Sequence, residues 1–143
     1  MPIEKNALIE AGLVYENGNQ YFDGFITFPH LHCGKVVYVS GRAYPDKKHK
    51  KLQKENVALE HLYNEQAVHN KTVIIAEGEI DTLTLLQNGF NACGVLGVQS
   101  FKDEWLEKFN SCEIVYIAFD GDSAGRTSSL KLAAIFGAKA KIV

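Results

Sequence analysis

Residues 73–83 read VIIAEGEIDTL, an apolar run that leads directly into three acids. The pattern returns at residues 115–125, VYIAFDGDSAG, where two aspartates follow the apolar run. Each run has the length and the β-branched content of a buried strand. A glycine and then a helical pattern follow each run, so the acids fall where a strand ends and a helix begins. The two stretches therefore predict two strand–helix units with carboxylates at the strand ends.

The rest of the second half continues this alternation. Strand-like runs and helical patterns occupy, in turn, residues 57–68 (helix), 72–78 (strand), 80–89 (helix), 91–97 (strand), 100–109 (helix), 113–121 (strand), 123–137 (helix) and 138–143 (strand). Strands that alternate with helices over short connections form a parallel sheet with helices on both faces. We therefore predict an α/β fold with a parallel four-stranded sheet flanked by helices.

The first part of the chain has an irregular α+β texture. A helical stretch at 4–11 precedes two aromatic or β-branched runs at 21–29 and 35–43, which predict a short antiparallel unit. The intervening HLHC contains two histidines and a cysteine, but a four-ligand zinc site needs a further ligand. No partner pair is evident in the sequence, so we do not expect zinc there.

The composition limits the class of protein. A chain of 143 residues with 46% hydrophobic content fits one globular domain, or one domain with a small subdomain. No apolar run approaches the roughly 20 residues that span a bilayer, and the N-terminus lacks the features of a signal peptide. Three scattered cysteines without CxxC spacing favour reduced intracellular thiols. We expect a soluble, cytoplasmic protein with no membrane contact.

The charge is distributed unevenly. A net charge of -2 argues against a generally cationic surface for nucleic acid. Residues 46–54, DKKHKKLQK, nevertheless hold five lysines and one acid. Such a run is either a solvated loop or a phosphate-binding patch, and both interpretations stay open.

The acids lie where open α/β sheets bind ligands, at the carboxyl ends of the strands. Glu77 ends one predicted strand, and Asp120 and Asp122 flank a glycine after another. Asp81 and Asp122 could each simply cap a helix, and we interpret Glu79 as a solvated charge at a helix end. Asp120 caps nothing obvious, so capping alone does not explain the set.

If the two strands are neighbours, Glu77, Asp120 and Asp122 converge. Like charges at close range destabilise a fold unless a cation neutralises them. Oxygen-only ligands favour Mg²⁺ or Mn²⁺ over zinc, and magnesium sites keep room for waters and substrate phosphates. The expected chemistry is phosphoryl or nucleotidyl transfer.

Two stretches resemble a known family. AEGEIDTLTLLQNGF (76–90) followed by AFDGDSAGRTSSLKLA (118–133) resembles the TOPRIM domain shared by bacterial-type DNA primases, type IA and type II topoisomerases, RecR-like proteins and some nucleases. Upstream, FDGFITFPHLHCGKVVYVSGRAYPDKKHKKLQ (22–53) resembles the segment that precedes TOPRIM in bacterial and phage-type primases. This second resemblance favours a primase.

The resemblance implies a TOPRIM (Rossmann-like) domain over residues 57–143, preceded by a small α+β segment, 1–56, of the primase polymerase core. It implies a nucleotidyltransferase that makes RNA primers on single-stranded DNA from nucleoside triphosphates, and a replicative helicase as a partner through other domains. It also implies roles for individual residues. The catalytic residues would be Glu77, Asp120 and Asp122. The same three residues and Asp81 would bind the metal ion, Mg²⁺ or Mn²⁺. The template or the nucleotide would be contacted by Arg42, Lys50 and Lys51.

The chain also departs from the family pattern. The third acidic motif of the family lies beyond the fourth strand, and the chain stops at Val143 before reaching it, so we expect weak or no activity from the chain alone. Two alternatives stay open: phosphodiester cleavage of the TOPRIM nuclease or topoisomerase type, and a noncatalytic DNA-binding TOPRIM module.

Overall fold

The computed structural model describes residues 4–10, 14–20, 22–44, 60–97 and 100–143. The chain divides into two compact units, one of Met1–Pro29 with Tyr38–Ala58 and the other of His30–Val37 with Leu59–Val143. The domain boundary predicted between residues 56 and 57 lies outside the described residues, as do Lys50 and Lys51.

The first unit begins with a short helix and continues into a hairpin. Helix α1 (Lys5–Glu10) comes first, and β1 (Phe25–His32) and β2 (Lys35–Ala43) form a two-stranded sheet. Cys33 and Gly34 alone connect these strands, with φ angles of 49° and 75°, as a type I′ hairpin turn requires. The predicted antiparallel unit is confirmed, but the connection is shorter than expected because HLH belongs to β1. The tip of this hairpin, His30–Val37, belongs to the second unit.

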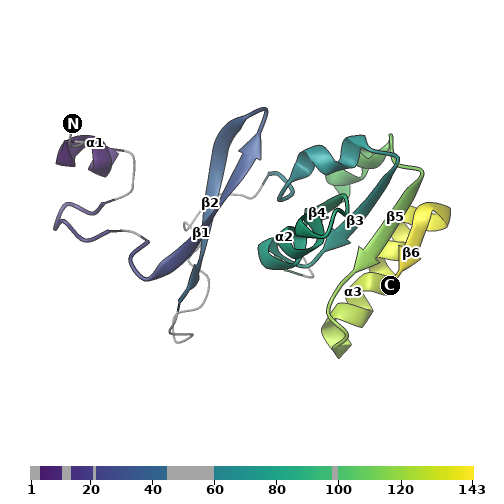
Figure 1. Ribbon diagram of the computed structural model, residues 1–143. Helices are drawn as coiled ribbons and strands as arrows, with labels where there is room; N and C mark the ends of the chain where they lie inside the picture. The colour runs from purple at the N-terminus through teal and green to yellow at the C-terminus, as the bar shows by residue number, and fades with distance from the viewer. Residues whose placement is uncertain (1–3, 11–13, 21, 45–59, 98–99) are drawn as a thin grey trace. The chain divides into compact units, whose positions relative to one another are not determined.

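A parallel four-stranded sheet forms the centre of the second unit and confirms the predicted fold (Figure 1). Its strand order is β4 (Ala92–Gly94), β3 (Thr72–Ala76), β5 (Ile114–Ala118), β6 (Ala140–Ile142). All neighbours run parallel, and the register aligns Ala76 at the end of β3 with Ala118 at the end of β5. The residues that follow these two alanines therefore leave the sheet at the same edge.

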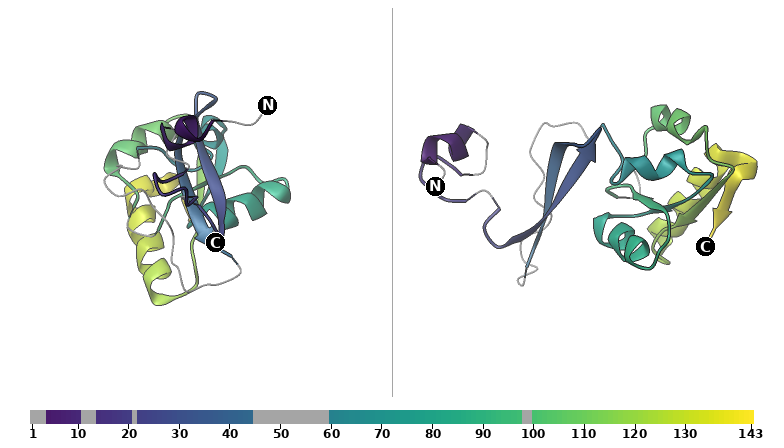
Figure 2. Two further views of the ribbon diagram at one scale, coloured as in Figure 1. Left: turned by 90° about the vertical axis from the view of Figure 1, so that its left-hand side faces the viewer. Right: turned by 45° about the horizontal axis from the view of Figure 1, so that its top comes forward.

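Helices flank this sheet. Helix α2 (Glu79–Gln87) packs against β4 and β3, and α3 (Ser123–Phe136) packs against β5 and β6. The left view of Figure 2 shows the teal-green α2 and the yellow-green α3 on opposite sides of the sheet. Within the part of the chain that the structure describes, no helix is long and apolar enough to cross a membrane.

One face of the sheet carries the main core. Apolar side chains from β3 and β5 pack there against aromatic and aliphatic side chains of the 3₁₀ helix η2 (Asp103–Phe109) and of α3. The central members are Val73, Ile75, Val115, Ile117, Trp105, Phe109, Leu132 and Phe136. The Phe136 ring meets that of Phe109 edge-on at 4.9 Å between centroids. Gly137, with a φ of 58°, then ends α3 as the sequence predicted.

Two predicted helices differ from the structure. Residues 60–64 are not helical, because the backbone N–H and C=O of Tyr63 both pair with Gly94 at 2.9 Å and extend the sheet. Only a short 3₁₀ helix, η1 (Glu65–His69), follows. The helix predicted at 100–109 is the 3₁₀ helix η2, which begins at Asp103. Ser100 does not cap it, since the Ser100 hydroxyl donates to the carbonyl of Gly97 at 2.6 Å.

Candidate active site at the ends of β3 and β5

The adjacency of β3 and β5 brings Glu77 and Asp120 together. Glu77 follows the last residue of β3, and Asp120 lies two residues beyond the end of β5. The Asp120 backbone N–H donates to Glu77 Oε2 over 3.4 Å. The carboxylate of Glu77 is thus held against the loop that carries both aspartates, as the predicted convergence of the two segments requires.

Glycines allow the backbone to close tightly around this edge. A Cβ on Gly125 would collide with the backbone carbonyl of Asp120, so the first turn of α3 lies directly on the DGD loop. A Cβ on Gly94 would lie 2.5 Å from the hydroxyl of Thr82 and 3.1 Å from the carbonyl of Gly78. Thr82, fully buried, donates to that carbonyl at 2.7 Å. The first contact holds α3 against the DGD loop, and the other two hold the turn after Glu77 against β4.

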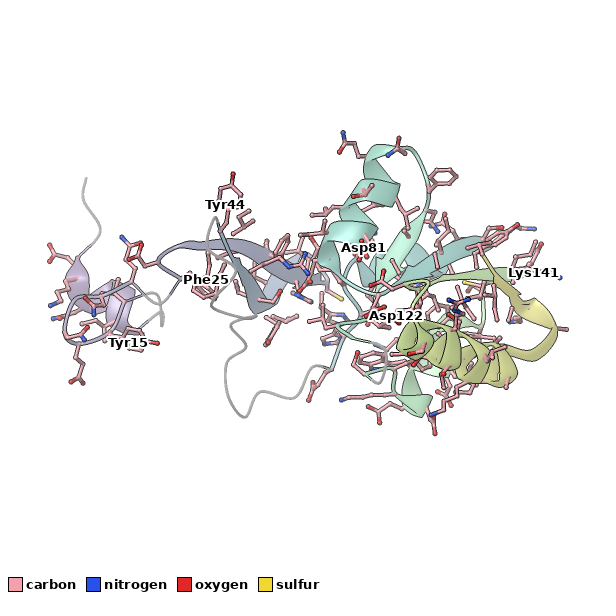
Figure 3. All side chains as sticks on the ribbon, turned by 90° about the horizontal axis from the view of Figure 1, so that it is seen from below. Tyr15, Phe25, Tyr44, Asp81, Asp122 and Lys141 are labelled. Carbon is pink, nitrogen blue, oxygen red and sulfur yellow. The ribbon has the colours of Figure 1, made fainter. Side chains whose placement is uncertain are left out.

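The other two predicted acids lie at helix starts on the same edge, and Figure 3 shows Asp81 and Asp122 there. Asp122 is the N-cap of α3, and its Oδ1 accepts from the Gly125 N–H at 2.7 Å. Asp81 lies in the first turn of α2, with Oδ2 3.6 Å from the place of a Cβ on Gly78. The capping role expected of Asp122 is therefore real, and it occupies only one of the two carboxylate oxygens.

The donor set suits a hard cation. All four acids present carboxylate oxygens, and none of them forms an ion pair with another described residue. Their oxygens do not form a closed group: among the described residues, the one set of three ligand-type side chains with donor atoms within 4.8 Å is His32, His61 and Glu65. An open arrangement of carboxylates fits Mg²⁺, which keeps waters and binds substrate phosphates.

Glu79 corrects the interpretation made from the sequence. It is 6% exposed, not solvated, and its Oε1 lies 3.7 Å from Nε2 of the buried His30. The ring of His30 meets Tyr63 edge-on at 4.9 Å. Burial, and then the nearby charge of Glu79, raise the pKa of the Tyr63 hydroxyl. Sequence reasoning missed this cluster because its members come from three separate segments.

Of the three predicted basic residues, the structure describes Arg42 alone. Arg42 is exposed on β2, within the first unit. Lys50 and Lys51 lie outside the described residues. The structure therefore brings Glu77 and Asp120 into contact, places Asp81 and Asp122 at the same edge of the sheet, and leaves the predicted nucleic-acid contacts as expectations.

Comparison with known proteins agrees with the geometry. Residues 74–143 match the Toprim-like family. The chain is 28% identical over 142 residues to a DNA primase of Neisseria meningitidis serogroup A, covering 90% of this chain and 24% of that protein. It is 33% identical over 137 residues to a DNA primase of Clostridium acetobutylicum, covering 87% of this chain and 23% of that protein.

Solved structures give the same result. A DnaG catalytic core matches with a TM-score of 0.69 and 27% identity, over 89% of this chain and 45% of that one. A DnaG primase catalytic domain bound to single-stranded DNA matches with a TM-score of 0.67 and 26% identity, over 90% of this chain and 44% of that one.

Residues 74–143 therefore form a TOPRIM domain. The domain is of the bacterial DNA primase type, because the matches to primases extend upstream of it and include most of the chain. The chain spans about a quarter of the length of the curated relatives that it matches.

Proposed function

We propose that this chain is part of the catalytic core of a DNA primase, which synthesises RNA primers on single-stranded DNA by nucleotidyl transfer from nucleoside triphosphates. The observation that carries the proposal is the contact of Glu77 with the Asp120 backbone at the edge shared by β3 and β5. It joins the two acidic motifs in a chain whose upstream half also matches primases.

Three carboxylates would hold the metal ion, and Glu77 would act as a fourth ligand or as a base. Asp120, Asp81 and the oxygen of Asp122 that is not used in the helix cap offer the hard oxygen ligands that Mg²⁺ or Mn²⁺ prefers. When bound, such a cation lowers the negative charge of a triphosphate and makes its α-phosphate a better electrophile. Gly121, with open space where a Cβ would stand, leaves the loop between the aspartates accessible to a bulky anion.

Glu77 would act beside these ligands. Its carboxylate is partly buried and is oriented by the Asp120 N–H, so it can serve as a further metal ligand or accept the proton of an attacking 3′-hydroxyl. The Asp120 N–H also places a partial positive charge against Glu77, which reduces the mutual repulsion of the acids.

Template binding would fall to basic residues. Arg42 is exposed on β2, and Lys50 and Lys51 belong to the lysine-rich segment 46–54. Lysine and arginine contacts to phosphates predict DNA binding that is independent of sequence and weakens as salt rises. A replicative helicase would be recruited through parts of a longer protein.

Metal binding and primer synthesis together test this function. Mn²⁺ binding is measured by electron paramagnetic resonance, and primer synthesis with a single-stranded template, nucleoside triphosphates and Mg²⁺ or Mn²⁺. We expect Asp120→Asn to weaken Mn²⁺ binding more than about tenfold and to reduce primer synthesis about 100-fold or more. Asp103→Asn, an exposed acid in the first turn of η2, is the matched control and should change neither.

The outcomes separate the three functions. Cleavage of single-stranded DNA without primer synthesis would assign the site to a nuclease. DNA binding that ignores both the metal and Asp120→Asn would assign the chain to a noncatalytic module. The chain alone is expected to be weakly active. The Mn²⁺ measurement therefore tests whether the acids bind a metal ion even where no primer synthesis is detected.

A further inference from the structure

A second cluster of ligand-type side chains lies in the TOPRIM-containing unit, apart from the acids of the proposed active site. His32 ends β1 at the hairpin tip, His61 precedes η1, and Glu65 is the first residue of η1. One donor atom from each lies within 4.8 Å of the other two. The cluster thus combines two imidazoles and one carboxylate, whereas the acids beyond β3 and β5 offer oxygen alone.

The distances within the cluster match those around a small tetrahedral ion. His32 Nδ1 lies 3.3 Å from Glu65 Oε1, and His61 Nδ1 lies 3.4 Å from Glu65 Oε2. For bonds of about 2.0–2.1 Å, two ligands of a tetrahedral Zn²⁺ lie about 3.3 Å apart. Each histidine nitrogen therefore lies at such a distance from the Glu65 carboxylate, His32 from one of its oxygens and His61 from the other.

The carboxylate is held in place by groups outside the cluster. Glu65 Oε2 accepts from Lys108 Nζ at 2.7 Å and from the Leu62 backbone N–H at 3.2 Å, which leaves Oε1 facing His32. The Lys108 ammonium therefore pairs with the charged form of this carboxylate, which is the form that binds a metal ion.

The two imidazoles of the cluster lie against each other. The rings of His32 and His61 stack with centroids 4.0 Å apart and planes 20° apart. His61 Nδ1 is fully buried, and within the described chain its contact with Glu65 Oε2 at 3.4 Å does not have the geometry of a hydrogen bond. A buried ring nitrogen without a hydrogen bond is costly unless something binds it, and a metal ion would.

The cluster opens onto a cavity. A cavity of about 300 Å³ is lined by His32 and Glu65 and also by Cys33, Gly34 and His69. Two of the three proposed ligands, His32 and Glu65, thus face open space, as in zinc sites where water or a small molecule takes the fourth position. The space gives a metal ion a route into the site.

We propose that His32, His61 and Glu65 form a binding site for a transition metal ion, of which Zn²⁺ fits the nitrogen and oxygen ligands best. Imidazole favours Zn²⁺, Cu²⁺ or Ni²⁺ over Mg²⁺, so this site and the proposed magnesium site select different ions. An ion here would join the hairpin tip to the segment before η1, because His32 belongs to the first and His61 to the second. Its binding therefore stabilises the fold, and the stabilisation grows with the logarithm of the free Zn²⁺ concentration once that exceeds the dissociation constant.

The test adds Zn²⁺ to the metal-free chain and follows the thermal unfolding midpoint and the stoichiometry by competition with a chromophoric chelator. We expect one tightly bound Zn²⁺ per chain, a rise in the midpoint, and intense visible absorption when Co²⁺ replaces Zn²⁺ in a four-coordinate site. His32→Ala and His61→Ala should each weaken Zn²⁺ binding about 100-fold or more.

Two controls make the result decisive. His69→Ala removes an imidazole that lines the same cavity but lies outside the ligand group, and it should keep the affinity for Zn²⁺. Asp120→Asn with Asp122→Asn should also keep it, which separates this site from the proposed active site. The half-exposed His32 ring makes His32→Ala the variant least able to disturb folding. Zn²⁺ binding that survives His32→Ala, or that depends equally on His69, would overturn the proposal.

Discussion

The Asp120 backbone N–H donates to Glu77 Oε2 over 3.4 Å, although 43 residues separate these two positions in the chain. The contact follows from the parallel register that aligns Ala76 of β3 with Ala118 of β5. Its consequence is chemical: a peptide dipole faces the Glu77 carboxylate, which forms no ion pair with any residue that the structure describes. The site therefore keeps its negative charge available for a cation.

Gly125 is predicted to be essential for the shape of the DGD loop. A Cβ at this position would collide with the Asp120 carbonyl, a backbone atom that cannot rotate away. We expect Gly125→Ala to lower the free energy of unfolding by about 1–3 kcal/mol and to weaken Mn²⁺ binding. Chemical denaturation measures the first effect. Gly121→Ala is the control, since a Cβ there meets nothing within 4 Å, and equal losses in both variants would contradict the steric argument.

Asp122 is predicted to have two separable roles. Its Oδ1 caps α3 through the Gly125 N–H, and the carboxylate charge would bind the metal ion. Asp122→Ala should cost about 1 kcal/mol of stability by removing the cap and should also weaken Mn²⁺ binding. Asp122→Ser keeps a capping oxygen but removes the charge, so it should lose only the metal affinity. Thermal unfolding and Mn²⁺ titration of the pair distinguish the roles, and a serine variant that binds Mn²⁺ normally would remove Asp122 from the site.

The parallel sheet was predictable because its central strands are buried on both faces and read as apolar, β-branched runs. The strand order was not, since it depends on contacts between distant segments. That order decides whether Glu77 meets Asp120. From the sequence, the meeting of Glu77 and Asp120 was predictable only on the condition that their strands are neighbours, and the adjacency of β3 and β5 fulfils that condition.

The wrong predictions for the helix at residues 60–64 and for Glu79 have a common physical cause. Leu62 and Tyr63 have helical spacing with Leu59, but Tyr63 instead pairs its backbone with Gly94, a partner from another segment. Glu79 has the position of a solvated helix-end acid, but His30 of the hairpin tip lies against it. Local periodicity contains no information on such long-range partners, which override weak helix preferences. The division between residues 56 and 57 stays a prediction.

Glu65 is predicted to make stability depend on acidity. Burial opposes ionisation, but Lys108 outweighs it, so the pKa in the folded chain lies below the ordinary value of 4.5. A lowered pKa contributes stability that is full above 4.5 and is lost as the pH falls through the folded-state pKa. We expect the unfolding free energy of the wild type to fall as the pH drops below the ordinary value of 4.5, and Glu65→Gln to remove part of this dependence.

The exposed pair of Lys71 and Glu113, 2.8 Å apart, supplies the control for the effect of pH. Solvent screens such a pair, so Glu113→Gln should leave the pH profile close to that of the wild type. Lys108→Met should destabilise the chain at neutral pH by about 1–3 kcal/mol, because it leaves the Glu65 carboxylate without its charged partner. Urea denaturation across the pH range measures all three variants, and identical profiles for Glu65→Gln and Glu113→Gln would refute the assignment.

The three thiols are predicted to differ in reactivity. Cys33 is exposed, whereas Cys93 and Cys112 are buried in the core, and burial raises the pKa of both buried thiols. The Cys112 thiol also donates to the Val68 carbonyl at 3.1 Å. Because the thiolate is the nucleophile, we expect one thiol per chain to react rapidly with a disulfide reagent, and the other two only after unfolding.

The variant Cys33→Ser checks the assignment of the reactive thiol. It should abolish the fast phase of the reaction with the disulfide reagent and leave the slow phase, that of Cys93 and Cys112, unchanged. The slow phase should accelerate with denaturant in step with the loss of structure, since exposure of the core limits it. Two or three fast thiols in the folded wild type would mean that the core around Cys93 and Cys112 opens far more readily than its burial implies.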